Sequence, residues 1–256
     1  MHYLLLILAK IKDILIISNP DHISSFKSLL GKGSKFGVNI SYESQENPNG
    51  IASALSIGKD FLKKSHCALI LGDNVFYGNN LGNLISKSMK SKKLASIFTY
   101  NVKDPSRYGI LEFTKMMEPK MIVEKPENPK SKRAVTGLYV YKNSALQNLN
   151  KLKPSSRGEL EITDFNNLFF KSKQINVEHF GRGIGWFDAG TSKSMMEASM
   201  FVQFIQERQG VLIGSPEETS LNSGFIEKNS LKNFLKNSPD SDYYNNLRTS
   251  LDNYQL

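Results

Sequence analysis

Hydrophobic and polar positions along the first third of the chain follow two alternating periods. Short apolar runs predict strands at residues 13–18, 38–42 and 67–72, and segments with one apolar face predict helices at residues 22–30 and 52–62. Strands that alternate with helices in this way indicate a parallel sheet with right-handed crossovers. The chain is therefore predicted to have an α/β, Rossmann-like fold, in which a mostly parallel sheet is flanked by helices.

The pattern changes in the second part of the chain. After a helix at 81–90 and a strand at 95–100, three strands at 109–113, 121–125 and 135–141 follow one another without long helices. They predict a β-rich insertion laid against the main sheet. A strand at 175–180 and a helix at 193–209 come next, and weak helical periodicity at 230–236 and 243–251 predicts a small helical C-terminal appendage.

Polar side chains stand where several of these strands end. Asp73 and Asn74 follow an apolar run, Glu124 and Lys125 end another strand, and Asp188 ends an aromatic one. Ligands of open α/β sheets bind beyond the carboxyl ends of the strands. Taken singly, each acid also has a plainer explanation, because Asp73 and Asp188 can cap a turn or helix and Glu124 can form a surface salt bridge.

The combination of these groups is typical of phosphate chemistry. Two carboxylates, Asp73 and Asp188, are oxygen ligands of the kind that Mg²⁺ takes together with substrate phosphates. Lys125 can neutralise a phosphate, and Glu124 and Asn74 can hydrogen-bond hydroxyl groups. The sequence therefore predicts phosphoryl or nucleotidyl transfer involving a polyol phosphate.

Composition narrows the classes of protein that fit. The 256 residues carry a formal net charge of +9, but the lysines are scattered and no nucleic-acid-binding motif is visible, so a solvated basic surface is favoured over a nucleic-acid partner. The one cysteine, Cys67, excludes an internal disulfide and suits the cytoplasm. No apolar run reaches the length of a membrane span, so no membrane partner is expected, and a single domain of residues 1–256 is predicted.

A set of sequence runs occurs in the order and spacing of a known family. The runs are QENPNGIASA, LGDNVFYG, NVKDPSRYGILEF, VEKP, AVTGLYVY, KPSSRGELEITD and GRGIGWFDAGT. Through them the chain resembles bacterial glucose-1-phosphate thymidylyltransferases, which are sugar nucleotidyltransferases of the dTDP-rhamnose pathway. The resemblance covers nearly the whole chain. It implies Mg²⁺-dependent transfer from dTTP to α-D-glucose 1-phosphate, which yields dTDP-glucose and pyrophosphate in a homo-oligomeric enzyme.

The resemblance also implies roles for individual residues. Gln45 and Gly50 would read the thymine base, and Asp73 with Asp188 would hold the magnesium. The rest of the substrate site would include Asn74, Tyr108, Gly109, Glu124, Val135, Glu159 and Trp186. Lys125 and Arg157 would bind the sugar phosphate and complete the catalytic set. Residues 1–100 would form the nucleotide-binding part, 101–209 the sugar- and metal-binding part, and 210–256 the appendage.

The sequence departs from this family at its start. Family members begin with a strand and a Gly-rich loop of the form LAGGxGTRLxPxTxxxxKxxxP, which cradles the triphosphate, and Met1 aligns just after it. We therefore expect a truncated chain that lacks a central strand, leaves the neighbouring strands with unpaired backbone groups, and turns over poorly. Ser53, where the family has Gln, and Ala189, where it often has Thr, do not change this expectation.

Three other hypotheses stay open at this point. A uridylyltransferase of the same family differs only in its nucleotide. A non-catalytic remnant would bind a nucleotide sugar, or pair with a full-length subunit, without turnover. A basic nucleic-acid binder would show a steep salt dependence of its affinity, although no reading helix or aromatic platform supports it.

Overall fold

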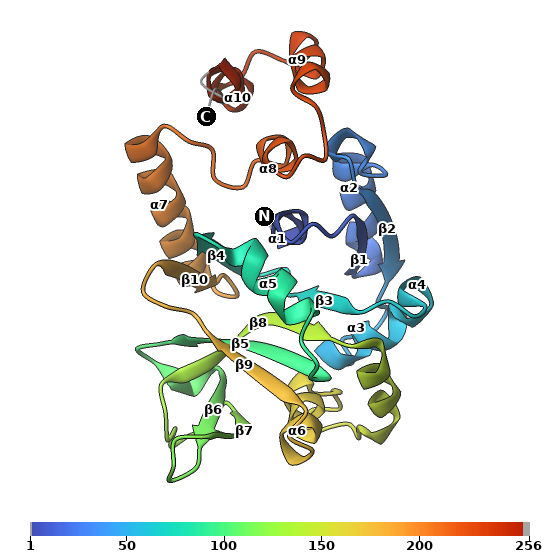
Figure 1. Cartoon of the computed structure of the whole chain (residues 1–256), viewed down its shortest axis with the longest axis vertical. Coiled ribbons are helices and arrows are strands. Elements are labelled where there is room, and N and C mark those ends of the chain that lie inside the picture. Colours follow the sequence, from blue (N-terminus) through green and yellow to red (C-terminus); the bar gives the residue numbers. More distant parts are fainter. Residues whose placement is uncertain (1, 253–256) are drawn as a thin grey trace.

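A mixed sheet of six strands organises the molecule in a computed structural model that describes residues 2–252 (Figure 1). Its strands are β3 (Cys67–Ile70), β5 (Ala95–Asn101), β6 (Gly109–Phe113), β7 (Pro119–Glu124), β8 (Arg133–Tyr141) and β9 (Ile175–His179). Strand β8 pairs antiparallel with β3, β5 and β6, and β9 pairs parallel with β5. The α/β class is confirmed, but the sheet is mixed instead of mostly parallel, because β8 is its central strand and not part of an insertion.

Helices cover both faces of this sheet. Helices α1 (His2–Leu8) and α5 (Leu81–Met89) pack on one face, and α3 (Ile51–Ile57) and α6 (Ile162–Lys171) pack on the other. Alternate residues of a strand point to opposite faces. Accordingly, Leu138 and Val140 of β8 join the apolar cluster under α1 and α5, while Tyr139 and Tyr141 join the cluster under α3 and α6.

A second, two-stranded sheet lies beside the first. Strands β1 (Asp13–Ser18) and β2 (Asn39–Ser44) pair in parallel, and α2 (Pro20–Leu30) contacts both. Within residues 2–252, β1 pairs only with β2, and β3 pairs only with β8. The continuous parallel sheet predicted for residues 13–73 is therefore wrong. An apolar groove separates β1 from β3, and helices α1, α3 and α4 (Lys59–Leu62) contribute to its walls.

The strand predicted at residues 67–72 ends at Ile70, and a turn and an unpredicted strand follow it. Strand β3 ends at Ile70, Gly72 and Asp73 form the turn, and β4 (Asn74–Gly78) begins a new pairing. Strand β4 pairs antiparallel with β10 (Ile184–Asp188), with Asn74 opposite Asp188. This short ribbon carries both predicted metal ligands to the same place in the fold.

The remaining elements complete the scaffold. They are three short 3₁₀ helices (Ser34–Phe36, Pro105–Arg107 and Asn143–Lys151) and the helices α7 (Ser192–Gln209), α8 (Pro216–Asn222), α9 (Lys228–Lys236) and α10 (Asp242–Asp252). The helix predicted at 52–62 is divided at Gly58 into α3 and α4. Helices α9 and α10 form the predicted C-terminal appendage around their own cluster of leucines, and α8 was not foreseen. No helix within residues 2–252 is long and apolar enough to cross a membrane.

Candidate active site

The carboxylates of Asp73 and Asp188 converge beside Gly190. A methyl group placed on Gly190 would lie 3.2 Å from Asp188 Oδ1 and 3.5 Å from Asp73 Oδ2. The backbone fixes this approach, because Ala189 N donates to the Asp73 carbonyl at 2.7 Å and Gly190 N donates to Asp188 Oδ1 at 3.3 Å. The structure thus brings together the two acids that the sequence places 115 positions apart.

Asn74 is buried at the base of this pair. Its Oδ1 accepts from Gly137 N at 2.9 Å and from the Trp186 indole N–H at 2.7 Å, and its Nδ2 donates to Asp73 Oδ1 at 2.7 Å. The contact is so close that a methyl group on Gly137 would lie 2.7 Å from the Asn74 amide. With 4% of its surface exposed, Asn74 is committed to internal bonds. These bonds give the side chain a positioning role towards Asp73, and the predicted sugar contact of Asn74 stays a prediction.

Trp186 is likewise an internal residue of the site. Its side chain is buried, and its ring packs against Tyr108 with a centroid distance of 5.2 Å. Tyr108 is half-buried, and burial raises the pKa of its phenol. Arg107 lowers this pKa and Asp188 raises it, both by less than burial does. Trp186 therefore supports Tyr108 instead of presenting its own polar atom to a substrate.

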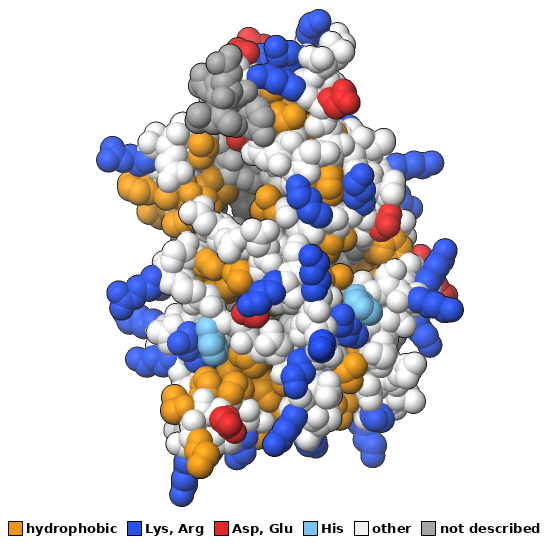
Figure 2. All heavy atoms as spheres, in the orientation of Figure 1, with side chains coloured by type: hydrophobic (Ala, Val, Ile, Leu, Met, Phe, Trp, Pro, Cys, Tyr) orange, Lys and Arg blue, Asp and Glu red, His pale blue; other side chains and the backbone are white. Residues whose placement is uncertain are grey.

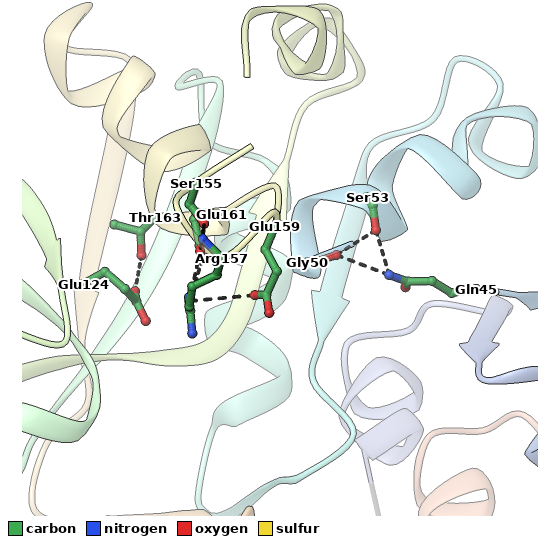
Figure 3. Close-up of polar contacts among 9 residues, drawn as sticks. All are labelled: Gln45, Gly50, Ser53, Glu124, Ser155, Arg157, Glu159, Glu161 and Thr163. Atoms are coloured by element: carbon green, nitrogen blue, oxygen red, sulfur yellow. Dashed lines mark hydrogen bonds and ion pairs between the residues drawn. The ribbon is translucent and has the colours of Figure 1, made fainter. Parts of the chain in front are cut away.

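The predicted sugar site forms where β6 and β7 pair. Gly109 lies opposite Glu124, and a methyl group on Gly109 would approach Glu124 Oε2 to 3.2 Å. The Thr163 hydroxyl of α6 donates to the same carboxylate oxygen at 2.6 Å (Figure 3). This bond orients a carboxylate whose residue remains exposed to a ligand. Val135 of β8 lies in the apolar cluster beneath α3 and α6.

Tyr139 is a buried tyrosine of β8 whose phenol pKa is affected by both Glu124 and Asp73. Burial raises the pKa of its phenol, and the carboxylates of Glu124 and Asp73 raise it further. The hydroxyl therefore stays neutral between two acids. Sequence reasoning did not single out Tyr139, because a tyrosine in a β-rich run is most simply read as core.

Lys125 follows β7 in an uncommon backbone conformation. Its φ is 41°, which is costly for a residue with a side chain, and it precedes Pro126. Its amide donates to the Tyr108 carbonyl at 3.0 Å, which holds the turn. Within residues 2–252 the exposed ammonium has no ion-pair partner. A strained, unpaired lysine next to Glu124 is well placed to meet an anion.

Arg157 is engaged with acids of its own loop. Its Nη2 donates to both oxygens of Glu161, at 2.9 and 3.1 Å, and lies 3.7 Å from Glu159 Oε2 (Figure 3). The Ser155 hydroxyl also donates to Glu161, at 2.7 Å. Arg157 lies between Glu124 and the Gln45 loop in this view, and it must exchange an internal partner to bind a phosphate.

The Gln45–Gly50 loop is fixed to the loop that carries Arg157. Leu160 N donates to the Asn49 carbonyl at 2.8 Å, and Ala52 N donates to the Leu160 carbonyl at 3.2 Å. Gly50 has a φ of 92°, and a methyl group on it would lie 2.4 Å from the Leu160 carbonyl oxygen. Only glycine fits this approach. The predicted nucleotide and sugar regions are thus tied together through the main chain.

Two further features adjoin the acid pair. Arg107 Nη2 lies 3.9 Å from Asp188 Oδ2, a partner that the sequence did not reveal because the contact is between segments distant in the chain. On the other side, Asp73 lines an open groove of about 590 Å³ whose far wall is α7. The groove provides room for a ligand next to the acids.

The acid pair fits one kind of divalent-cation site, in which the protein supplies only one or two ligands. No cluster of three or more candidate ligand side chains occurs within the described residues. Magnesium, however, is commonly held by one or two carboxylates together with substrate phosphates and water. Two carboxylates that converge beside Gly190, one of which lines a groove, fit that chemistry.

Comparison with known proteins places this geometry in a family. Residues 1–204 match the nucleotidyl transferase family. The glucose-1-phosphate thymidylyltransferase of Neisseria meningitidis serogroup A is 41% identical over 238 residues, covering 93% of this chain and 83% of the relative. The enzyme of that name from Mycolicibacterium smegmatis is 42% identical over 247 residues, covering 96% and 85%.

Solved structures show the same relationship. A putative glucose-1-phosphate thymidylyltransferase from Bacillus anthracis, in complex with sucrose, has a TM-score of 0.73 at 33% identity and covers 84% of this chain and 83% of its own. A UDP-glucose pyrophosphorylase complexed with UDP-glucose, at 22% identity and a TM-score of 0.64, shares the fold.

The fold is that of a nucleotidyltransferase. The chain belongs to the nucleotidyl transferase family and, within it, to the glucose-1-phosphate thymidylyltransferases.

Proposed function

We propose that this chain transfers a thymidylyl group from dTTP to α-D-glucose 1-phosphate, giving dTDP-glucose and pyrophosphate. The observation that carries the proposal is the convergence of Asp73 and Asp188 beside Gly190. Glu124 and Lys125, which are exposed at the end of β7, complete the proposed set of polar groups. The identity of more than 40% to two thymidylyltransferases over most of both chains supports the choice of substrates.

In the proposed reaction an oxygen of the sugar phosphate attacks the α-phosphorus of dTTP. A new phosphorus–oxygen bond forms as the bond to the β-phosphate oxygen breaks, and pyrophosphate leaves with that electron pair. A phosphate dianion is already a nucleophile, so the protein supplies position and charge neutralisation and needs no general base. Lys125 and Arg157 neutralise the sugar phosphate, and Gln45 and Gly50 face the base.

A magnesium ion is part of the proposal. Asp73 and Asp188 would hold it, and when bound it would offset the negative charge of the phosphates. The protein's own contribution is to keep the two acids converged, which the Asn74 amide does by donating to Asp73. Glu124, held by Thr163, would accept hydrogen bonds from sugar hydroxyl groups.

The assembly and location of the protein are also proposals. Helix α7 exposes Met195, Met196, Met200 and Phe204, each more than half accessible, which supports a contact with a second copy in a homo-oligomer. A single buried cysteine supports a cytoplasmic location.

A direct assay tests the activity. Purified protein is incubated with dTTP, glucose 1-phosphate and Mg²⁺, and pyrophosphate release and dTDP-glucose are measured, with UTP in parallel. The proposal expects product with dTTP, none without the sugar phosphate, and less with UTP. Faster turnover of UTP would identify a uridylyltransferase instead.

The acid pair is tested by removing one charge at a time. Asp73→Asn and Asp188→Asn are expected to lower kcat at least about 100-fold, because each removes half of the cation's protein ligands. Asp60→Asn removes an exposed carboxylate on α4 that belongs to no proposed site. It serves as the matched control and should retain wild-type activity. Near-normal turnover of either site variant would contradict the assigned role.

A second candidate function is nucleotide-sugar binding without catalysis, alone or beside a full-length subunit. The open edges of β1 and β3 favour it, since a strand with one unpaired edge can pair with a further strand. Calorimetric binding of dTDP-glucose without turnover would select this function.

A further inference from the structure

Ser53 forms a short relay between the backbone and Gln45. It lies in the first turn of α3, and its hydroxyl donates to the Gly50 carbonyl at 2.7 Å. The Gln45 Nε2 in turn donates to Ser53 Oγ at 2.8 Å, and it lies 3.4 Å from the Gly50 carbonyl (Figure 3). All three groups are partly buried.

The relay determines which end of the Gln45 amide faces inward. The two ends of a glutamine amide have nearly the same shape, so their hydrogen-bond partners decide the orientation. The single hydroxyl hydrogen of Ser53 is directed at the Gly50 carbonyl, which also accepts from Ser53 N at 3.3 Å. Ser53 Oγ can then only accept, and the NH₂ end of Gln45 must face it. A flipped amide would place its oxygen against two acceptors.

The start of the relay is rigid. The Gly50 carbonyl belongs to a residue that is pressed against Leu160, where even a methyl group would meet the Leu160 carbonyl oxygen at 2.4 Å. Ala52 N also donates to the Leu160 carbonyl, which holds this approach in place. The orientation of Gln45 is therefore set by main-chain packing through Ser53. It leaves Gln45 Oε1 as the outward acceptor, without a protein partner among the described residues.

We propose that Ser53 is a specificity-determining, positioning residue that makes Gln45 select a uracil-type base, thymine or uracil, over cytosine. This inference rests on the proposed function, in which Gln45 faces the base. Thymine and uracil carry a hydrogen on N3, which can donate to Gln45 Oε1. Cytosine N3 is an acceptor and would face the Gln45 oxygen without a hydrogen between them. A site built to receive an N–H rejects a ligand that lacks it.

The test compares affinities for dTDP and dCDP by calorimetry, in the presence of Mg²⁺, on the full chain. The wild type is expected to bind dTDP at least about 10-fold more tightly than dCDP, which corresponds to one misplaced hydrogen bond. Ser53→Ala frees the amide to turn, so this ratio should fall at least about threefold. Ser53→Thr keeps the hydroxyl and should keep the ratio, and so should Ser56→Ala, an exposed serine of the same helix.

The ratio of the two affinities distinguishes the role of Ser53 from that of Gln45. A merely structural role of Ser53 would weaken the binding of dTDP and dCDP equally. If Gln45→Ala abolishes the preference but Ser53→Ala leaves it unchanged, the relay inference is overturned and the base site stands. If Gln45→Ala leaves both affinities at wild-type values, or the wild type binds no dTDP, the base site itself is wrong. Thermal unfolding of each variant verifies that it is folded.

Discussion

At the scale of single residues, the site depends on one buried amide. Asn74 accepts hydrogen bonds from Gly137 N and the Trp186 indole and donates to Asp73. It therefore links the central strand β8, the β4–β10 ribbon and a proposed metal ligand. A strand-end asparagine beside an aspartate was read as a substrate contact, since nothing local in the sequence reveals that its partners come from residues 137 and 186.

Replacing this amide should destabilise the fold. Asn74→Leu keeps the volume but leaves two buried donors without an acceptor, at a cost of about 1–3 kcal/mol each. We expect a loss of about 2–6 kcal/mol in the free energy of unfolding, measured by urea titration. Trp186 is the one tryptophan of the chain, so its fluorescence follows both unfolding and the lost contact. Exposed Asn79→Ala is the control, and a loss below about 0.5 kcal/mol for Asn74→Leu would refute this role.

A second residue-scale prediction concerns alkaline pH. Burial raises the pKa of the Cys67 thiol from 9.0 to about 12. Between these values the unfolded chain releases a proton that the folded chain retains, so stability falls as the pH rises above 9. The loss at pH 10 should be about 1.4 kcal/mol.

The measurement compares wild type with Cys67→Ala in urea titrations from pH 8 to pH 10. Tyrosines that titrate in the same range affect both proteins alike, so the difference between the two stabilities isolates the thiol. That difference should change by about 1.4 kcal/mol in favour of the variant between these pH values. A constant difference would mean that the thiol is not protected.

At the scale of elements, strand β1 has one edge that is hydrogen-bonded to β2 and one edge that has no strand partner within residues 2–252. The Lys12 and Ser18 carbonyls accept from Asn39 N and Gln45 N next to β2. The backbone groups of successive strand residues point to opposite sides, so Ile14 and Ile16 also face β2, while Leu15 and Ile17 face the groove towards β3.

Amide hydrogen exchange should therefore alternate along β1. The amides of Leu15 and Ile17 are expected to exchange at least about 10-fold faster than those of Ile14 and Ile16, because they lack a strand partner. Residues of β8, which is paired on both edges, provide the slow reference. Uniform protection along β1, measured by NMR, would show that a further partner occupies the groove.

Prediction from sequence succeeded where the signal is local. The alternating periods located most helices and strands, and the two strand-end acids Asp73 and Asp188 lie close together in the structure. Pairing was less predictable, because a nine-residue apolar strand such as β8 has the same pattern in a parallel or an antiparallel sheet. Strand β4, which follows the turn at Gly72–Asp73, was not predicted, because it is defined by its pairing with the distant strand β10. The Ser53 relay and the Arg107–Asp188 contact depend on tertiary approach.

At the scale of the whole molecule, charge is distributed instead of concentrated. The chain has a formal net charge of +9, and Figure 2 shows Lys and Arg side chains spread over most of the visible face. Such a surface attracts small anions from all directions but offers no single basic strip to a nucleic acid. The electrostatic contribution to substrate binding should therefore be long-range and sensitive to salt.

Ionic strength tests this contribution. Raising the salt from about 20 to about 200 mM shortens the screening length to below about 10 Å, so the affinity for dTDP should fall about 3- to 10-fold. Thymidine carries the same base without phosphates, and its weaker binding should be nearly independent of salt. Calorimetry at constant Mg²⁺ measures both ligands, and duplex DNA should show no comparable affinity at 200 mM salt. Equal salt dependence of dTDP and thymidine would show that the net charge does not assist binding and that local contacts such as Lys125 supply the attraction.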